Sequence, residues 1–131
     1  VKAENIEDHN IHEEYIEVSS EVLDLVDKTR DNQKKVYAVG TTTTRALETA
    51  YLENMKNGYS GYTKLFIYPG YKFKVVDRLI TNFHMPKSSL LMLVSAFIGF
   101  DNMKNIYKTA IEERYRFLSY GDVMLLNKNE I

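Results

Sequence analysis

Polar groups of four chemical kinds gather in a short segment directly before a strongly apolar one. An amide, an imidazole, an ammonium group and a hydroxyl come from Asn82, His84, Lys87 and Ser88. Pro86 favours extended backbone before it and marks the approach to a helix start. Polar groups beside an apolar helix are costly to bury unless they are paired or used, so this segment is a candidate binding or catalytic site. The competing interpretation is that His84 is a structural residue with satisfied hydrogen bonds.

A second candidate lies at residues 39–45, where a glycine separates a predicted strand from a predicted helix. The free N–H groups of a helix start attract anions, and the hydroxyls of Thr41, Thr42 and Thr43 add donors. The Arg45 guanidinium offers a fork for a carboxylate or a phosphate. The pattern is neither a P-loop nor the dinucleotide-binding fingerprint, and a threonine-rich helix start with no ligand is the alternative.

Two further segments carry weaker signals. Tyr68 and Tyr71 flank a Pro-Gly turn, where aromatic rings can stack on a base or cover a sulfonium; core packing is the alternative. Tyr120 and Asp122 lie beside a glycine that ends the last helical region. An acidic residue at the edge of a strand often only caps a turn.

The elements that position these residues alternate between strands and amphipathic helices. β-formers predict strands at residues 15–18, 35–39, 65–68 and 123–126, with extended backbone near 79–80. Apolar periodicity predicts helices after Ser19 or Ser20, from residue 41, from Ser88 or Ser89 to residue 98, and from a cap at Asn102. The apolar 89–98 helix should be buried. This alternation predicts an α/β fold, a three-layer sandwich with a mostly parallel sheet.

Composition excludes several classes of site. The chain has 131 residues, a net charge of −1 and no cysteine, which rules out a disulfide scaffold and a thiolate metal site. His9 and His12 lack a third ligand at a convincing spacing, so we expect no metal. No signal peptide and no apolar run near the ~20 residues of a membrane span are visible. We therefore expect a cytoplasmic protein. Residues 62–99 carry five basic side chains against one acidic one, as a surface that meets an anion would; ordinary variation of surface charge is the alternative.

Five segments in order resemble the C-terminal motifs of the S-adenosylmethionine:tRNA ribosyltransferase-isomerase (QueA) family. They are HNIHEEY at residues 9–15, VGTTTTR at 39–45, FIYPGY at 66–71, TNFHMPKS at 81–88 and YRFLSYGD at 115–122. The resemblance runs through essentially the whole chain, but the family's N-terminal region and inserted β-barrel have no counterpart. We expect residues 1–131 to form a single α/β domain, a C-terminal fragment of a longer enzyme.

The resemblance implies an enzyme that moves the ribosyl part of S-adenosylmethionine onto 7-aminomethyl-7-deazaguanine in tRNA, giving epoxyqueuosine. It implies tRNA and S-adenosylmethionine as partners, no cofactor beyond this co-substrate, and no metal. The chemistry needs a base that removes the proton beside the sulfonium, groups that hold the methionine part, and cations for the tRNA backbone. We expect the 131-residue chain alone to be inactive, since much of the family chain is missing.

The residue types suggest how these roles are divided. His84 is the candidate base, because its unperturbed pKa of ~6.5 lies nearest to neutrality. We expect its segment to share a pocket with the Tyr68–Tyr71 turn. The predicted substrate-binding residues are Thr41, Thr42, Thr43, Arg45, Tyr68, Tyr71, Asn82, Lys87, Ser88, Tyr120 and Asp122. The predicted tRNA-binding cations are Lys72, Lys74 and Arg78. A non-catalytic RNA-binding module and another α/β enzyme that binds an anionic small molecule stay open as alternatives, and the oligomeric state is not predicted.

Overall fold

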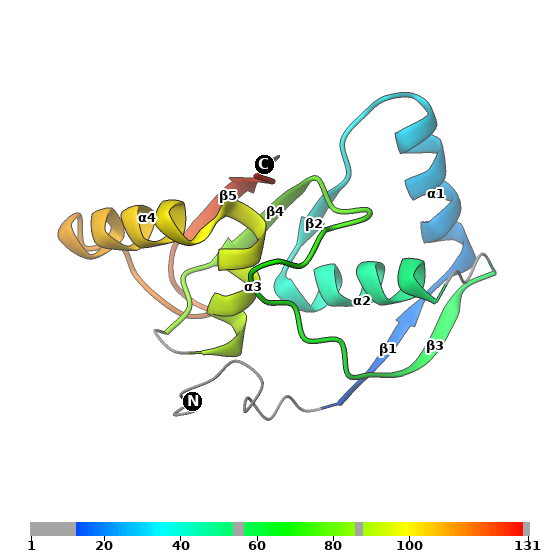
Figure 1. The fold of residues 1–131 in the computed structure, drawn as a ribbon, viewed down its shortest axis with the longest axis horizontal. Coiled ribbons are helices and arrows are strands. Elements are labelled where there is room, and N and C mark those ends of the chain that lie inside the picture. The colour runs from blue at the N-terminus through cyan, green and yellow to red at the C-terminus, as the bar shows by residue number, and fades with distance from the viewer. Residues whose placement is uncertain (1–12, 54–56, 86–87, 130–131) are drawn as a thin grey trace.

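The computed structural model describes residues 13–53, 57–85 and 88–129, and it confirms the α/β class (Figure 1). No helix in these ranges is long and apolar enough to cross a membrane. In chain order the elements are β1 (Glu14–Val18), α1 (Ser20–Asp31), β2 (Tyr37–Val39), α2 (Thr41–Leu52), β3 (Tyr59–Thr63), β4 (Arg78–Asn82), α3 (Ser89–Ile98), α4 (Phe100–Glu112) and β5 (Val123–Asn127).

The strands form two sheets, and their pairing corrects the expectation of a mostly parallel sheet. β1 pairs with β3 in an antiparallel ribbon, and a three-stranded sheet has the order β2-β4-β5. Within that sheet β2 and β4 are parallel, whereas β4 and β5 are antiparallel. Parallel pairing needs a crossover, which α2 supplies between β2 and β4. Two helices in series, α3 and α4, follow β4 and return the chain to the end where β4 stopped, so β5 runs in the opposite direction.

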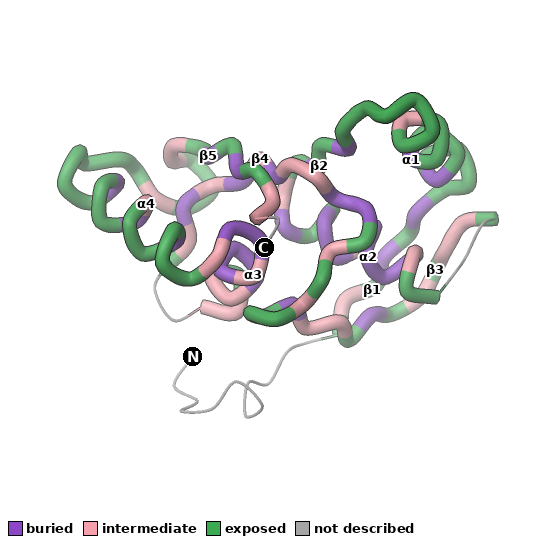
Figure 2. The backbone as a smooth tube through the Cα atoms, turned by 45° about the horizontal axis from the view of Figure 1, so that its top comes forward, coloured by how far each residue is buried: buried purple, intermediate pink, exposed green. Residues whose placement is uncertain are grey.

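The middle layer of the molecule is a helix. α2 contacts strands of both sheets and lies between them in Figure 1. Seven of its residues are buried, from Thr41 to Ala50, on several sides of the helix. Burial is concentrated in α2 and α3, whereas α1 and α4 are largely exposed (Figure 2). Three layers are therefore present, but the helix α2 takes the central place in which we expected a sheet.

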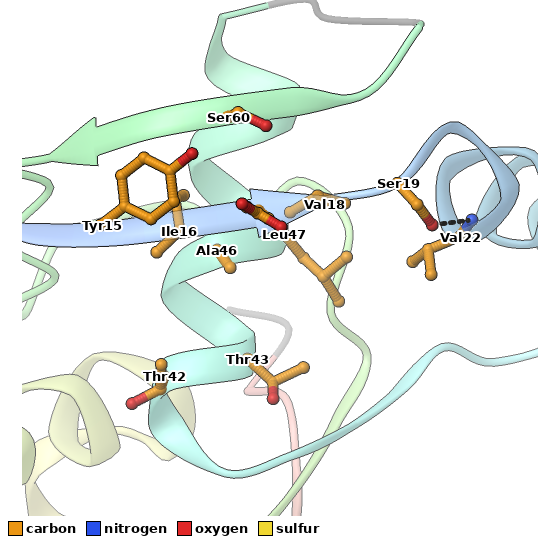
Figure 3. Close-up of a pocket in the computed structure, with 11 residues that line it drawn as sticks. Tyr15, Ile16, Val18, Ser19, Val22, Thr42, Thr43, Ala46, Leu47 and Ser60 are labelled. Atoms are coloured by element: carbon orange, nitrogen blue, oxygen red, sulfur yellow. Dashed lines mark hydrogen bonds between the residues drawn. The ribbon is translucent and has the colours of Figure 1, made fainter.

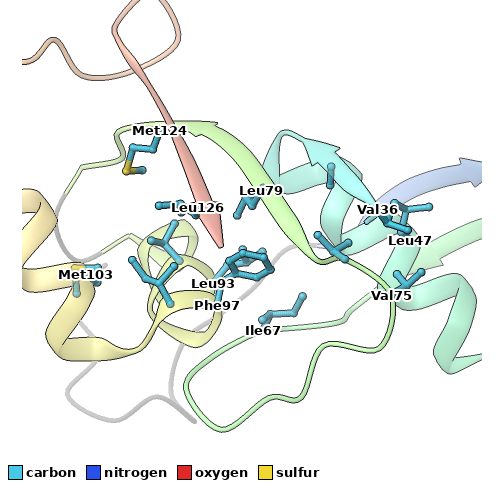
Figure 4. Close-up of a cluster of buried hydrophobic side chains, with 14 of the residues drawn as sticks. Val36, Leu47, Ile67, Val75, Leu79, Leu93, Phe97, Met103, Met124 and Leu126 are labelled. Carbon is cyan, nitrogen blue, oxygen red and sulfur yellow. The ribbon is translucent and has the colours of Figure 1, made fainter. Parts of the chain in front are cut away.

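The core gathers apolar side chains from α2, α3 and one face of the three-stranded sheet (Figure 4). Leu79 and Phe97 are fully buried at its centre. The prediction that the 89–98 helix is buried is confirmed for its second half, since Leu93, Val94 and Phe97 are buried, while Leu90 is 38% exposed.

Helix ends follow local chemistry where a side chain can cap them. Ser19 and Ser88 accept hydrogen bonds from the N–H groups of Val22 and Leu91, so both predicted caps are confirmed. The predicted cap at Asn102 is wrong. α4 begins at Phe100 after Gly99, whose φ of 92° is a backbone conformation that favours glycine, and Asn102 instead donates to Ile98 O.

One predicted strand is absent and one unpredicted strand is present. Residues 65–68 have strand-like side chains but pair with no strand; Ile67 is 1% exposed and fills the core from a loop. Gly58, Ser60 and Gly61 are residues typical of a loop, yet β3 runs through this segment because it pairs with β1 along its full length. Tertiary contacts outweigh local propensity in both places: core packing at residues 65–68 and strand pairing at β3.

Candidate functional site

The turn that carries Tyr71 is fixed by a buried carboxylate on α2. Glu48 is fully buried. Its Oε1 accepts hydrogen bonds from the Tyr71 hydroxyl (2.8 Å) and the Lys74 N–H (2.7 Å). Its Oε2 accepts from the N–H groups of Val75 (2.9 Å) and Val76 (3.1 Å). Burial and the neighbouring Glu48 raise the pKa of Tyr71 above its ordinary value, so the phenol remains a donor at neutral pH. Four bonds to one carboxylate thus determine where this segment lies.

A cleft of about 560 Å³ opens beside this turn, and we call it the Tyr71 cleft. Its volume falls within the usual range of small-molecule sites, roughly 300–1,000 Å³. The ring of Phe73 lies edge-on to those of Tyr71 and Phe97, with centroids 5.1 Å and 4.9 Å apart. The described lining residues are Pro69, Gly70, Tyr71, Lys72, Phe73, Ser95, Ala96, Gly99, Phe100, Lys128 and Asn129.

Two lysines, Lys72 and Lys128, line the Tyr71 cleft. Lys72 is exposed, and Lys128 lies 3.7 Å from the carboxylate of Asp77. Lys128 also lines a small adjoining cleft of about 70 Å³ together with Lys35 and Arg78. A run of positive side chains, interrupted by Asp77, therefore follows this edge of the molecule, as binding to a phosphate backbone requires. Lys74, a further predicted tRNA-binding residue, is exposed nearby in the chain.

His84 lies in a half-buried position after β4. Its Nε2 is 3.2 Å from Thr81 Oγ1, and its backbone N–H donates to the Tyr107 hydroxyl at 2.9 Å. Burial lowers the pKa of His84, so the ring is neutral near pH 7 and able to accept a proton. Burial also raises the pKa of Tyr107. The predicted base thus has the protonation state that a base needs, within a network that also has a structural function.

The structure separates His84 from the Tyr71 cleft. His84 precedes the first residue of α3, whereas Ser95, Ala96 and Gly99 line the cleft at the other end of that helix. At 1.5 Å per residue, the ten residues of α3 span roughly 15 Å. His84 is not among the described residues that line the cleft. The predicted pocket shared by the His84 segment and the Tyr68–Tyr71 turn is therefore not formed at this cleft.

The Asn82–Asp122 pair is brought together by the β4–β5 sheet. Asn82 Nδ2 donates to the backbone carbonyl of Asp122 at 3.1 Å. The Asp122 carboxylate accepts from the Arg116 N–H at 2.7 Å and pairs with its guanidinium at 3.6 Å. Gly121 lies so close to this loop that an added Cβ would meet Arg116 O at 2.4 Å. These polar groups close the 116–122 loop, and Tyr120 projects from it, 99% exposed.

The residues predicted to bind a ligand at the Gly40 turn lie in two different environments. Gly40 has a φ of 96° and, having no side chain, makes no side-chain cap at the start of α2. Thr42 and Thr43 are exposed and line a second, mainly apolar cleft of about 580 Å³ (Figure 3). Tyr15, Ile16 and Val18 of β1 form its other wall. Thr41 is buried.

Arg45, in contrast, is 5% exposed and points into the protein. Its Nη1 pairs with Glu14 at 3.2 Å, and its Nε donates to Leu65 O at 3.0 Å. The Nη2 atom has no hydrogen-bond partner in the described part of the chain. The carboxylate that Arg45 binds in this structure is therefore the protein's own, and a role with substrate stays a prediction.

Of the remaining predicted residues, one caps a helix, one lies at the surface and one lies outside the described ranges. Ser88 caps α3 with its hydroxyl. The ring of Tyr68, 41% exposed, packs near Phe66 with centroids 5.3 Å apart. Lys87, like His9 and His12, lies outside the described residues. Within the ranges that the structure covers, no three His, Cys, Asp or Glu side chains group as metal ligands would.

Sequence reasoning missed Glu48, Lys128 and Asn129. Glu48 stands within an amphipathic helix, where an acidic side chain usually marks the solvent face, and its partners lie 23 to 28 residues away. The composition of residues 127–131 is typical of a polar tail. The Asn129 N–H, however, donates to Phe97 O at 2.8 Å, and Asn129 lines the Tyr71 cleft.

The comparisons with known proteins agree on one family. A family model described as "Queuosine biosynthesis protein" matches residues 1–126. The chain is 58% identical over 127 residues to an S-adenosylmethionine:tRNA ribosyltransferase-isomerase of Halothermothrix orenii, covering 96% of this chain and 37% of that protein. It is 52% identical over 129 residues to the protein of the same name in Vesicomyosocius okutanii, covering 98% and 38%.

A solved structure agrees with these relatives. The crystal structure of an S-adenosylmethionine tRNA ribosyltransferase from Thermotoga maritima superimposes with a TM-score of 0.82 at 48% identity, covering 85% of this chain and 39% of that one. The chain thus spans well under half the length of each of these relatives. Because the family model covers nearly all its residues, the chain belongs to the queuosine biosynthesis protein family.

Proposed function

We propose that this chain supplies part of a tRNA-modifying enzyme that transfers and isomerises the ribosyl part of S-adenosylmethionine onto 7-aminomethyl-7-deazaguanine in tRNA. The product is epoxyqueuosine, and adenine and methionine leave. The observation that carries the proposal is the 58% identity to a protein named S-adenosylmethionine:tRNA ribosyltransferase-isomerase over 96% of this chain. We further propose that the enzyme acts in the cytoplasm.

His84 is the residue that we propose as the base. Its lowered pKa leaves the ring unprotonated near pH 7, and its half-buried position limits competition from water. Thr81 Oγ1, 3.2 Å from Nε2, orients the ring. The free imidazole would accept the proton beside the sulfonium, and the protein environment would return it to solvent after the transfer.

The Tyr71 cleft is the surface that we propose for a segment of the tRNA. Its aromatic rings offer faces for a base, and Lys72 and Lys128 offer charge for phosphates. The cleft and His84 lie at opposite ends of α3. A tRNA, unlike a small molecule, is large enough to reach from one to the other.

The test is a chimera in which all 131 residues of this chain replace the matching segment of the Halothermothrix orenii relative. Incubated with S-adenosylmethionine and tRNA that carries 7-aminomethyl-7-deazaguanine, the chimera should form epoxyqueuosine, measured by mass spectrometry. The 131-residue chain alone should not. In the chimera, His84→Ala should lower turnover by about 100-fold or more, as loss of a general base does. S-adenosylmethionine binding should be retained.

Lys108→Ala is the matched control, because Lys108 is exposed on α4 and does not line the Tyr71 cleft. It should turn over as the unaltered chimera does. Normal turnover by His84→Ala would remove the proposed base but leave the function. A folded chimera that forms no product would contradict the function itself.

A further inference from the structure

One face of the β2-β4-β5 sheet carries apolar side chains that no element in the described part of the chain covers. Burial alternates strictly along the two outer strands. Ala38 of β2 and Met124 of β5 are buried, whereas Val39 is 67% and Leu125 60% exposed. Successive side chains of a strand point to opposite faces, so the buried set belongs to one face and the exposed set to the other.

The strand register places the exposed side chains in rows across the sheet. Val39, Ile80 and Leu125 are direct neighbours in one row. Val123, 61% exposed, continues the apolar surface beside Asn82. At the other end a polar row holds Tyr37, Arg78 and Asn127, in which the Arg78 guanidinium lies 5.3 Å from the centre of the Tyr37 ring. We call the surface made by these rows the open face.

The described helices leave the open face bare. Ala38, Leu79 and Leu126 lie in one row on the opposite face, and all three belong to the core that α2 and α3 cover. A sheet in an α/β protein is stable when both of its apolar faces are packed against other elements. The two outer strands expose Val39, Leu125 and Val123 on the open face, where ordinary solvent-facing strand positions would be polar.

The size of the open face indicates what covers it. β2 has three residues and β4 and β5 have five each, so strands about 10 Å and 17 Å long, about 4.8 Å apart, present roughly 200 Å². A stable homodimer needs ~800 Å² from each partner, so a second copy of the chain is a poor match. One α-helix, about 10 Å across with its side chains, fits these dimensions. The two relatives supply a source, since this chain spans only 37% and 38% of their length.

We propose that the open face of the β2-β4-β5 sheet is the docking surface for an amphipathic helix from the part of the family polypeptide that this chain does not span. The apolar stripe of that helix covers Val39, Ile80 and Leu125, and Arg78 at the polar end meets an acceptor group. A tethered segment needs less contact area than a free partner because its effective concentration is high.

The absence of cysteine from the chain allows a direct test by thiol labelling. Val39→Cys and Leu125→Cys report on the open face. Leu25→Cys on α1 and Ile111→Cys on α4 are matched controls, since these residues are 62% and 64% exposed outside it. Each substitution is placed in the chimera with the Halothermothrix orenii relative, whose own cysteines are replaced. Labelling by a small alkylating reagent is measured in native and in denaturing conditions.

Relative to the denatured protein, Val39→Cys and Leu125→Cys should label at least about tenfold more slowly in the native chimera, because a covered site reacts only when the helix detaches. The two control positions should label at close to the denatured rate. Fast labelling at Leu125→Cys in the folded chimera would overturn the proposal. Equal protection at all four positions would also overturn it. So would protection in the 131-residue chain alone that grows with protein concentration, because that result would identify a second copy as the occupant.

Discussion

Replacing Glu48 by glutamine should weaken the attachment of the Tyr71 turn to α2. The carboxylate accepts four hydrogen bonds, two at each oxygen, at distances of 2.7 to 3.1 Å. Glutamine keeps the size of the side chain but turns one acceptor into an NH₂ donor. Three of the four partners are backbone N–H groups, which cannot reverse their direction.

The cost follows from the two possible amide orientations. If the NH₂ group replaces Oε2, the N–H groups of Val75 and Val76 both lose their acceptor. If it replaces Oε1, the Tyr71 hydroxyl can rotate and accept, so only the Lys74 N–H is left unpaired. The second orientation costs less. A hydrogen bond to a charged acceptor is worth about 1.5–3 kcal/mol, so Glu48→Gln should lower the free energy of unfolding by about that amount.

Denaturant unfolding monitored by circular dichroism measures this change. Tyr71→Phe, which removes one of the four donors, should destabilise the protein by less than Glu48→Gln. The double variant should cost less than the sum of the two, because both act on one network. Tyr68→Phe is the control: its ring is 41% exposed, and the change should stay within about 0.5 kcal/mol. If Glu48→Gln unfolds within about 0.5 kcal/mol of the unaltered chain, the carboxylate does not fix the turn.

Two further outcomes are expected. In the chimera, the paired change Lys72→Ala and Lys128→Ala should weaken tRNA binding. It should also reduce the slope of log affinity against log salt by about one for each phosphate that is no longer neutralised, whereas Lys108→Ala should leave that slope unchanged. Equal slopes for the paired variant and the unaltered chimera would exclude the Tyr71 cleft from the tRNA surface. Because burial lowers the pKa of His84, the unfolded chain binds a proton more readily, so stability should fall as pH drops below about 6.5. Stability is measured as Tm at each pH, and His84→Gln should make the fall in Tm smaller. If the variant has the same pH profile of Tm as the unaltered protein, the result contradicts the burial of the ring.

The parts of the fold that were predicted correctly from the sequence rest on short-range chemistry. Ser19 and Ser88 each bond an N–H three residues ahead, so the information that starts α1 and α3 is local. The same holds for Gly99, which ends α3 with a positive φ. The cap at Asn102 was wrong because Gly99 already begins the next helix, and nothing in the sequence of that segment distinguishes a residue that starts a helix from one inside its first turn.

The candidate site was less accessible from the sequence because its geometry depends on distant partners. Tyr71 and Lys72 were chosen for their chemistry, but their position comes from Glu48, which stands on a different element. Arg45 was expected to face a ligand, yet the chain supplies Glu14 and Leu65 O as its partners. Periodicity shows that α2 is amphipathic; it does not show that two sheets enclose the helix and turn its polar side chains inward.

Because the two sheets enclose it, α2 positions two of the segments for which substrate contacts were predicted. At its start the exposed Thr42 and Thr43 line one cleft. Farther along, Glu48 holds the segment that forms the Tyr71 cleft, and Thr49 bonds the β3 residue Thr63 at 2.9 Å. The described residues that line the two clefts do not overlap. Any movement of α2 along its axis would therefore displace both clefts together, since the buried carboxylate and the first-turn threonines are parts of the same rigid helix.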